Sequence, residues 1–335
     1  MTLPATDLET HVAAPSDNEG GAESKAIVGR SPMQLAMRRF RKDKLSMAAL
    51  TVVVFYFLAA IAAPFLVHFG VLDPKGFNQD LLNEFTLPKG DWGGISWDHP
   101  LGVEPGSGRD VLSRVWYGIT FSLVMALAAT FIAVGLGVVF GIIAGVSGGL
   151  TDSVIGRLID LILSFPQTLM LLALSALFID ILVKDLHVPD GDMANGLYVV
   201  LVLGFFGWPY VARLVRGQVL SIREREFVEA SKLMGASRFR LYFKEILPNL
   251  WAPLLVSFTI TMPTYVSAEA ALNYLGVGIK PPTPTLGNVL SGSIDYSTSD
   301  FIFFFTPAFL IMIIVVSFNL LGDGLRDALD PKGHR

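Results

Sequence analysis

Residues 226–249 read EFVEASKLMGASRFRLYFKEILPN and form the longest mixed-charge stretch in the second half of the chain. Apolar segments flank this stretch on both sides, at 196–212 and 250–272, and each is near the length that crosses a bilayer. Charged side chains are costly in the hydrocarbon core. We therefore expect these residues to leave the membrane and to do more than connect two helices, since most connections are far shorter.

The composition of the whole chain indicates a membrane protein. Of the 335 residues, 52% are hydrophobic and 16% are charged, whereas charged residues make up about a quarter of an ordinary soluble domain. The net charge of −4, without a basic stripe, gives no sign of nucleic acid as a partner. The chain has no cysteine and its five histidines lie far apart in sequence, so we predict no disulfide, no metal site and no catalytic residue.

Six apolar stretches reach or approach the length of about 20 residues that a helix needs to cross a bilayer. They are 46–68, 119–147, 158–183, 196–212, 250–272 and 301–321. The fourth is the weakest, because Trp208 and Pro209 interrupt it, although a proline kinks a membrane helix rather than forbidding it. We predict an all-α integral membrane protein with six transmembrane helices in contact with the lipid bilayer.

The distribution of basic residues predicts the orientation of these helices, since lysine and arginine are retained on the cytoplasmic side during insertion. With the N-terminus inside, the inner segments hold 19 of the 25 Lys and Arg residues and the outer segments hold 6. Both termini are therefore predicted to be cytoplasmic. The same holds for the stretch at 226–249, which contributes much of the bias.

The stretch itself has the pattern of two short amphipathic helices. Gly235 interrupts the helical pattern at a point where a sharp bend needs a residue that tolerates a positive φ. Pro248 marks where the chain turns into the fifth span. A single apolar ridge runs along the first of the two helices, formed by Phe227, Ala230, Leu233 and Met234. Physical reasoning alone leaves two alternatives, a helix pair that lies on lipid headgroups or a ridge that binds another protein.

A family resemblance favours the second alternative. Glu229-Ala230-Ser231, then Gly235, then Ile246-Leu247-Pro248 resemble the EAA signature of the permease subunits of bacterial ABC importers, with Ser231 in place of the second alanine. In that family this loop forms the coupling helices that dock into a groove on the ATPase subunit. The resemblance implies a coupling role for Phe227, Glu229, Ala230, Ser231, Leu233, Gly235, Ala236, Ile246, Leu247 and Pro248.

Four further stretches resemble the C-type permease of dipeptide and oligopeptide transporters. They are HPLGVEPGSGRDVLSRVWYGITFSL at 99–123, GWPYVARLVRGQVL at 207–220, LNYLGVGIKPPTPTLGNVL at 272–290 and FNLLGDGLRDALDP at 318–331. This resemblance implies a transmembrane domain like that of type I ABC importers, in the cytoplasmic (inner) membrane of a bacterium. Nickel and glutathione importers share these motifs, so the substrate stays open between peptides and other small solutes.

The resemblance also implies partners and the source of energy. A second homologous permease subunit would complete a heterodimeric pore, two ATPase subunits would bind ATP and Mg, and an extracytoplasmic binding protein would deliver the substrate. The chain itself has no G-x-x-x-x-G-K-[ST] loop, and GVGIKPPT lacks the spacing of a phosphate-binding loop. We therefore expect no cofactor in this chain and ATP hydrolysis on separate subunits.

Glu269 is the one acidic residue well inside a predicted span. A carboxylate that faces lipid would cost a few kcal/mol, so Glu269 should face protein or a water-filled path. One alternative is a polar contact with a neighbouring helix, and the other is a place in the translocation path, where it would meet the amino terminus of a peptide. A secondary transporter would need more ionisable residues within the spans, and an intramembrane enzyme would need a paired catalytic set; neither is present in the sequence.

Three local expectations concern packing. Small residues recur every four positions in the second span, which predicts close approach of another helix; they are Ala133, Gly137, Gly141 and Gly145. Arg157 and Asp160 are expected to pair within one helix. Arg109 and Arg114 are expected on an amphipathic helix at the outer surface.

The predicted organisation follows from these assignments. Residues 1–30 are polar and acidic and are predicted to form a disordered cytoplasmic tail. The remaining segments are the amphipathic stretch and first span at 31–70, an extracytoplasmic loop at 71–118, the permease core at 119–321 with its cytoplasmic loop at 213–249, and a cytoplasmic tail at 322–335.

Overall fold

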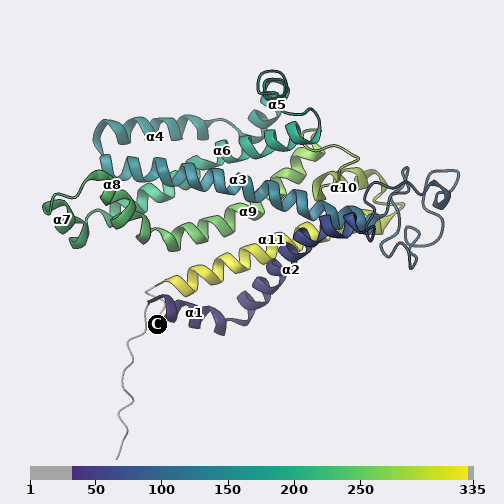
Figure 1. The fold of residues 1–335 in the computed structure, drawn as a ribbon, viewed down its shortest axis with the longest axis horizontal. Helices are drawn as coiled ribbons and strands as arrows, with labels where there is room; N and C mark the ends of the chain where they lie inside the picture. The colour runs from purple at the N-terminus through teal and green to yellow at the C-terminus, as the bar shows by residue number, and fades with distance from the viewer. Residues whose placement is uncertain (1–31, 331–335) are drawn as a thin grey trace, which may run out of the picture.

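A computed structural model describes residues 32–330 of the chain. The predicted tail at 1–30 and the last residues of the predicted C-terminal tail lie outside this range. Long helices run along the length of the molecule, with α7 and α8 at one end and α10 with the loop that follows α2 at the other (Figure 1). The helical bundle therefore separates the short helices α7 and α8 from α10 and the loop that follows α2.

The helical elements follow one another with few long connections. They are α1 (Pro32–Lys42), α2 (Lys44–His68), η1 (Gln79–Leu81), α3 (Val111–Ser147), α4 (Gly149–Ser164), α5 (Gln167–Lys184), α6 (Asp192–Ile222), α7 (Glu226–Leu233), α8 (Arg238–Arg240), η2 (Leu241–Ile246), η3 (Leu247–Asn249), α9 (Trp251–Tyr274), α10 (Leu286–Ser293), η4 (Ile294–Tyr296) and α11 (Phe301–Leu329). Within 32–330, α2, α3, α5, α6 and α11 are long and apolar enough to cross a membrane, and α9 brings the number to six when it is taken together with the bent segment before it. This agrees with the six predicted spans.

The ends of several spans differ from the sequence-based boundaries. α3 begins at Val111 rather than 119, because the carboxylate of Asp110 accepts the backbone N–H of Ser113 at 2.6 Å and caps the helix there. α6 continues to Ile222, well beyond 212, and α11 continues to Leu329, into the segment predicted as a tail. At these ends the helices continue past the apolar stretch into charged residues, so hydropathy alone does not predict where the helices end.

The predicted third span at 158–183 is broken in the structure. α4 ends at Ser164, and α5 begins at Gln167. Phe165 and Pro166 between them are extended, with ψ of 134° and 111°. Proline removes a backbone donor and disfavours helical geometry in the residue before it, which accounts for the break. Of these two helices, only α5 is therefore long and apolar enough to span a membrane.

α3 and α6 pack side by side through the small-residue ridge. A Cβ atom added at Gly141 would lie 2.7 Å from the Cβ of Val215, and one at Gly145 would lie 2.6 Å from a methyl group of Val219. These distances are shorter than a van der Waals contact, so only glycine allows the two backbones to approach this closely. The predicted packing role of the ridge is confirmed, and α6 is its partner helix.

Hydrogen bonds to backbone carbonyls tie α2 to α3 on one side and to α11 on the other. The indole N–H of Trp116 in α3 donates to the carbonyl of Ala59 in α2 at 3.1 Å, and Thr120 donates to Ala60 at 2.8 Å. The hydroxyl of Tyr56 in α2 donates to Leu310 in α11 at 3.1 Å. Such bonds are directional where apolar packing is not, so they help to fix the register of α2 against its neighbours.

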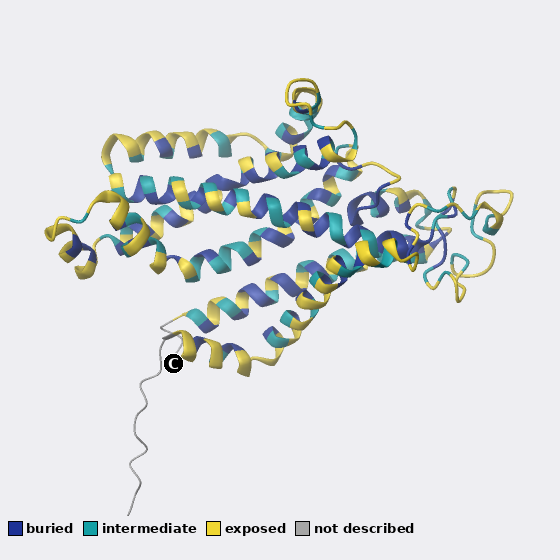
Figure 2. Ribbon diagram, in the orientation of Figure 1, coloured by how far each residue is buried: buried dark blue, intermediate teal, exposed yellow. Residues whose placement is uncertain are grey.

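An expected local ion pair takes a different form. The carboxylate of Asp160 in α4 binds the guanidinium of Arg213 in α6 at 2.8 Å, instead of pairing with Arg157 in its own helix. Arg216 in α6 makes a second link to α4, with two hydrogen bonds of 2.5 and 2.8 Å to Asp152. The hydrogen bonds from Arg216 lower the pKa of Asp152 from its ordinary value. α4 is therefore held along α6 by charge, on an otherwise exposed face (Figure 2).

The expectation for Arg114 is wrong. Its side chain is fully buried rather than on an outer surface. Its guanidinium lies 3.3 Å from the carboxylate of Glu104 and donates to the carbonyl of Pro282 at 3.2 Å. Arg109 is also largely buried and stacks over Phe77 at 4.5 Å. A desolvated arginine needs such partners, and here it joins three segments that are distant in sequence.

Candidate functional site

The predicted bend at Gly235 is present and has the geometry of a Schellman motif. Gly235 follows the end of α7 with φ of +78°. Its N–H donates to the carbonyl of Lys232, and the N–H of Ala236 donates to Ser231, both at 3.0 Å. These two bonds satisfy the last carbonyls of α7 and require a left-handed residue after the helix. The prediction of a positive φ at Gly235 is confirmed.

The chain then forms a second helical segment that leads back toward the bundle. The hydroxyl of Ser237 accepts the N–H of Arg240 at 3.3 Å and starts this segment, which consists of α8, η2 and η3. Pro248 lies in its last turn, and the helical segment Arg238–Asn249 meets α9 at an angle of 65°. Two short helices with a bend and a turn at Pro248 are therefore present, as predicted.

One face of this helix pair is buried against the bundle. Val228 and Ile246 are fully buried. They pack in a hydrophobic cluster with Val215 and Val219 of α6 and Ile142 of α3. The helix pair is therefore an extension of the core rather than a loose loop.

The opposite face exposes large apolar side chains. Leu233 is 89% exposed and Met234 is 76% exposed. The rings of Phe239 and Phe243 lie 4.5 Å apart, and both are exposed. Together with Phe227, these five residues form a surface that we call the coupling surface, after the role that the sequence predicts for residues 226–249. An apolar surface held in place by a buried opposite face is typical of a protein interaction site.

The ten predicted coupling residues thus divide into two groups. Ser231 and Ile246 are buried, and Ala236 and Leu247 are partly buried. The others are exposed; they are Phe227, Glu229, Ala230, Leu233, Gly235 and Pro248. No ion pair joins Glu229 to a basic group within residues 32–330, so its carboxylate is free to meet a partner protein.

Sequence reasoning missed the residues that anchor this surface. Val228 and Leu241 are buried apolar residues, and each lies next to an exposed residue in the sequence. The spacing of Val228 and Ser231 on one helical face was the available signal. Arg223 at the end of α6 donates to the carbonyl of Gly145 at 2.8 Å, which ties the start of the loop to α3. No local pattern identifies that contact.

Glu269 lies in α9 and is 1% exposed. Its carboxylate accepts a hydrogen bond of 3.0 Å from Ser122 in α3 and a second one from Asn273, one turn away in α9. Gly287 in α10 approaches it so closely that an added Cβ would lie 3.0 Å from the carboxylate. In this conformation Glu269 therefore joins α3, α9 and α10, which is the helix-contact alternative. Its place in the translocation path stays a prediction.

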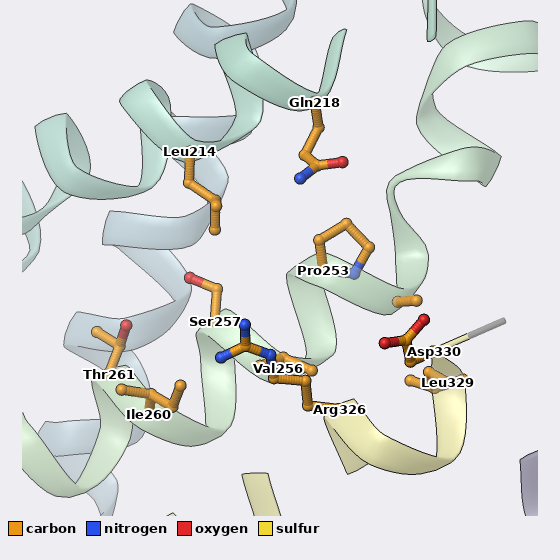
Figure 3. A pocket seen from close by; sticks show the side chains of 11 residues that line it. Leu214, Gln218, Pro253, Val256, Ser257, Ile260, Thr261, Arg326, Leu329 and Asp330 are labelled. Atoms are coloured by element: carbon orange, nitrogen blue, oxygen red, sulfur yellow. The ribbon is translucent and has the colours of Figure 1, made fainter. Parts of the chain in front are cut away.

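A cavity with a mostly apolar lining opens between α6, α9 and α11, on the same side as the coupling surface. Its volume is about 490 Å³. Gln218 of α6, Ser257 and Thr261 of α9 and Arg326 of α11 face it, together with apolar side chains (Figure 3). Within residues 32–330 the side chain of Arg326 has no ion-pair partner. The lining thus carries a cation, Arg326, and a carboxylate, Asp330, among apolar side chains.

These features define a class of protein, an all-helical multi-pass membrane protein with an exposed apolar surface on the helix pair between its fourth and fifth spans. Residues 137–334 match the family model of the binding-protein-dependent transport system inner membrane component, and residues 31–86 match that of the N-terminal TM domain of oligopeptide transport permease C. The chain belongs to this family of inner membrane permeases.

Individual relatives agree with this assignment. The chain is 38% identical to the dipeptide transport system permease protein DppC of Bacillus subtilis, over 94% of this chain and 90% of the relative. It is 36% identical to the glutathione transport system permease protein GsiD of Shigella flexneri serotype 5b, over 90% of this chain and 91% of the relative. The relatives are transport permeases rather than enzymes.

A solved structure supports the fold. The inward-facing MetNI methionine ABC transporter matches with a TM-score of 0.52 at 21% identity, over 65% of this chain and 97% of that chain. At this level of identity the match identifies the fold alone. The predicted resemblance to type I ABC importer permeases is confirmed.

Proposed function

We propose that this chain is one of two homologous permease subunits that together import di- or oligopeptides, driven by two ATPase subunits that bind ATP and Mg. An extracytoplasmic binding protein delivers the peptide, and the pore alternates between outward and inward openings. The identity to a dipeptide permease over nearly the whole chain supports the substrate class. The match of residues 31–86 to the N-terminal domain of an oligopeptide permease agrees with it.

The observation that carries the proposal is the two-sided structure of residues 226–249. Val228 and Ile246 are fully buried in the bundle, while Leu233 is 89% exposed. A force applied to the exposed face reaches α3 and α6 through packed side chains, because close-packed interiors transmit displacement. Closure of the ATPase subunits thus moves the helices that line the path.

The proposed orientation places this surface in the cytoplasm, where ATP is available. The excess of Lys and Arg on the same side as the coupling surface supports it. The cavity near Arg326 then lies at the cytoplasmic end of the bundle, and the loop after α2 faces the binding protein. Both termini lie inside in this orientation.

A second candidate is the same machinery with another substrate. The identity to a glutathione permease is 36%, close to that of the dipeptide permease, and nickel importers share the sequence motifs. Uptake of labelled dipeptide in vesicles that hold the complete transporter, with glutathione or Ni²⁺ as competitor, distinguishes these substrates. Competition by unlabelled dipeptides alone is the expected result, and preferential uptake of glutathione or nickel would refute the peptide assignment.

The coupling role is tested at Gly235. No atom lies within 4 Å of a Cβ added there, so the cost of a substitution is conformational. A β-branched residue at this φ of +78° costs about 1–2 kcal/mol, whereas asparagine tolerates this region of φ and ψ. Gly235→Val should therefore redirect α7, and Gly235→Asn is the matched control.

The measurement combines co-purification of the ATPase subunit with ATP hydrolysis stimulated by loaded binding protein. The Gly235→Val variant should insert normally but lose most of its bound ATPase subunit and most of the stimulated ATP hydrolysis. The Gly235→Asn variant should keep both the bound subunit and the stimulated hydrolysis. Glu229→Lys should weaken the same contact by charge repulsion. Normal coupling in both Gly235→Val and Glu229→Lys would leave residues 226–249 as a helix pair on the lipid surface.

A further inference from the structure

We infer that the cleft beside α1 is a binding site for an anionic phospholipid, and this inference rests on the proposed cytoplasmic orientation. α1 lies directly before the first span, α2, and packs along the end of α11. Ala36 and Phe40 form its buried face, at 8% and 7% exposure. The remaining faces of α1 are available to the surrounding bilayer.

An apolar cavity of about 370 Å³ lies between α1, α2, α9 and α11. Apolar side chains from all four helices line it, among them Met37, Phe40, Met47, Leu255 and Leu325. Arg41 is the one charged residue in its lining. The flexible methionines suit the acyl chain of a phospholipid, and the single cation suits the phosphate of its headgroup at the mouth of the cavity.

Four cations in the second half of α1 and at the start of α2 have no partner in the described part of the chain, whereas Arg39 donates to the carbonyl of Asp330 at 3.2 Å. Arg38, Arg41, Lys42 and Lys44 are exposed, and none forms an ion pair or a side-chain hydrogen bond within residues 32–330. The nearby carboxylate of Asp43 instead caps α2. A basic cluster immediately before a membrane helix attracts anionic headgroups of the cytoplasmic leaflet. The charge pattern thus selects an anionic lipid over a zwitterionic one.

The position of the cavity connects this lipid to the coupling segment. An adjoining cavity of about 490 Å³ shares Ala36 and Leu329 with the first, and it is also lined by Pro248 and Trp251. These last two residues flank the bend where the coupling segment enters α9. A lipid that fills both cavities would therefore reach from α1 to this bend.

The test uses the complete transporter purified with its ATPase subunits, titrated with phosphatidylglycerol or phosphatidylcholine and analysed by native mass spectrometry. Arg41→Gln removes the cation that lines the cavity. The matched control is Arg157→Gln, an exposed arginine in α4 that has no ion-pair partner within residues 32–330. Met37→Trp fills the cavity from a side chain that is 49% exposed, so the fold should tolerate it.

We expect retained phosphatidylglycerol at equimolar lipid to exceed retained phosphatidylcholine. Its affinity should fall about fivefold in Arg41→Gln and on the order of a hundredfold when Arg38, Arg41 and Lys42 are all changed to glutamine. Met37→Trp should also reduce binding, and Arg157→Gln should not. Equal retention of the two lipids, or equal loss in Arg41→Gln and Arg157→Gln, would overturn the site. So would the absence of any retained lipid, which would indicate that a protein segment fills the cleft.

A failure of the lipid site can be distinguished from a failure of the proposed function. The Arg41→Gln complex should still assemble with its ATPase and hydrolyse ATP when loaded binding protein is added, because Arg41 lies outside residues 226–249. Loss of lipid with coupling retained supports the site. Loss of coupling in the Gly235→Val variant concerns the proposed function alone.

Discussion

Gly141 and Gly135 lie in the same helix, α3, and allow a matched test of the packing between α3 and α6. A Cβ atom at Gly141 would lie 2.7 Å from the Cβ of Val215 and 2.8 Å from the carbonyl oxygen of Ala212. The second contact is with backbone, so it cannot be relieved by a change of rotamer. A Cβ at Gly135 would meet no atom within 4 Å.

The two alanine variants should therefore differ in stability. Alanine stabilises a helix interior by about 1 kcal/mol relative to glycine, and both variants gain this. Overpacking at Gly141 costs about 1–3 kcal/mol. We expect Gly135→Ala to stabilise the fold by about 1 kcal/mol and Gly141→Ala to lie about 1–3 kcal/mol below it.

The measurement is the temperature at which half of the detergent-purified permease remains monodisperse after a fixed heating time. A difference of 1–3 kcal/mol corresponds to roughly 2–12 °C between the variants, with Gly141→Ala the less stable. Heating time is kept constant because unfolding of such proteins is commonly irreversible. Equal midpoints for the two variants would refute the claim that α3 and α6 meet at Gly141.

Three further predictions concern single side chains and topology. Burial raises the pKa of Asp300, so its contribution to stability is greatest below the ordinary carboxylate pKa and is lost as pH rises through the raised value. Asp300→Asn keeps the acceptor for the N–H of Phe303 and should lose the gain in stability that the parent chain shows as pH falls through the raised value, whereas Asp300→Ala should cost about 1 kcal/mol; an unchanged pH profile in the asparagine variant would contradict this. Glu269→Gln should lower thermal stability and assembly more than it lowers uptake per assembled complex, because the carboxylate accepts hydrogen bonds from Ser122 and Asn273; a selective loss of uptake would instead place it in the translocation path. A cysteine introduced by Ser237→Cys should react with an impermeant reagent only from the cytoplasmic side, and one introduced by Ser291→Cys only from outside; labelling of Ser237→Cys in intact cells would refute the six-span orientation.

The sequence was sufficient to predict features that depend on local pattern. Apolar length predicts the spans, because a helix must satisfy its own backbone in lipid. The four-residue spacing of Gly137, Gly141 and Gly145 predicts close packing, and Gly235 predicts the end of α7. Each of these signals lies within a few turns of one helix.

The remaining features depend on contacts between distant segments. Arg114 reads as a surface residue until Glu104 and the carbonyl of Pro282 enclose it. Asp160 has a suitable partner within its own helix, yet Arg213 of α6 takes that place. Val228 is an anchor only because α6 supplies Val215 and Val219. No periodicity encodes which helix lies opposite, so these roles required the structure.

The central claim is that the coupling surface connects ATP hydrolysis to transport, and Leu233 offers the most direct measurement. Its side chain is 89% exposed, so Leu233→Ser should leave the fold intact. Met193→Ser, at a 62% exposed residue near the other end of α6, is the control. Peptide uptake and binding-protein-stimulated ATP hydrolysis are measured together in vesicles that hold both permeases and both ATPases. We predict that Leu233→Ser loses on the order of tenfold in uptake, with membrane insertion unchanged, while Met193→Ser keeps it. Full uptake in Leu233→Ser, with normal ATPase binding, would contradict the account.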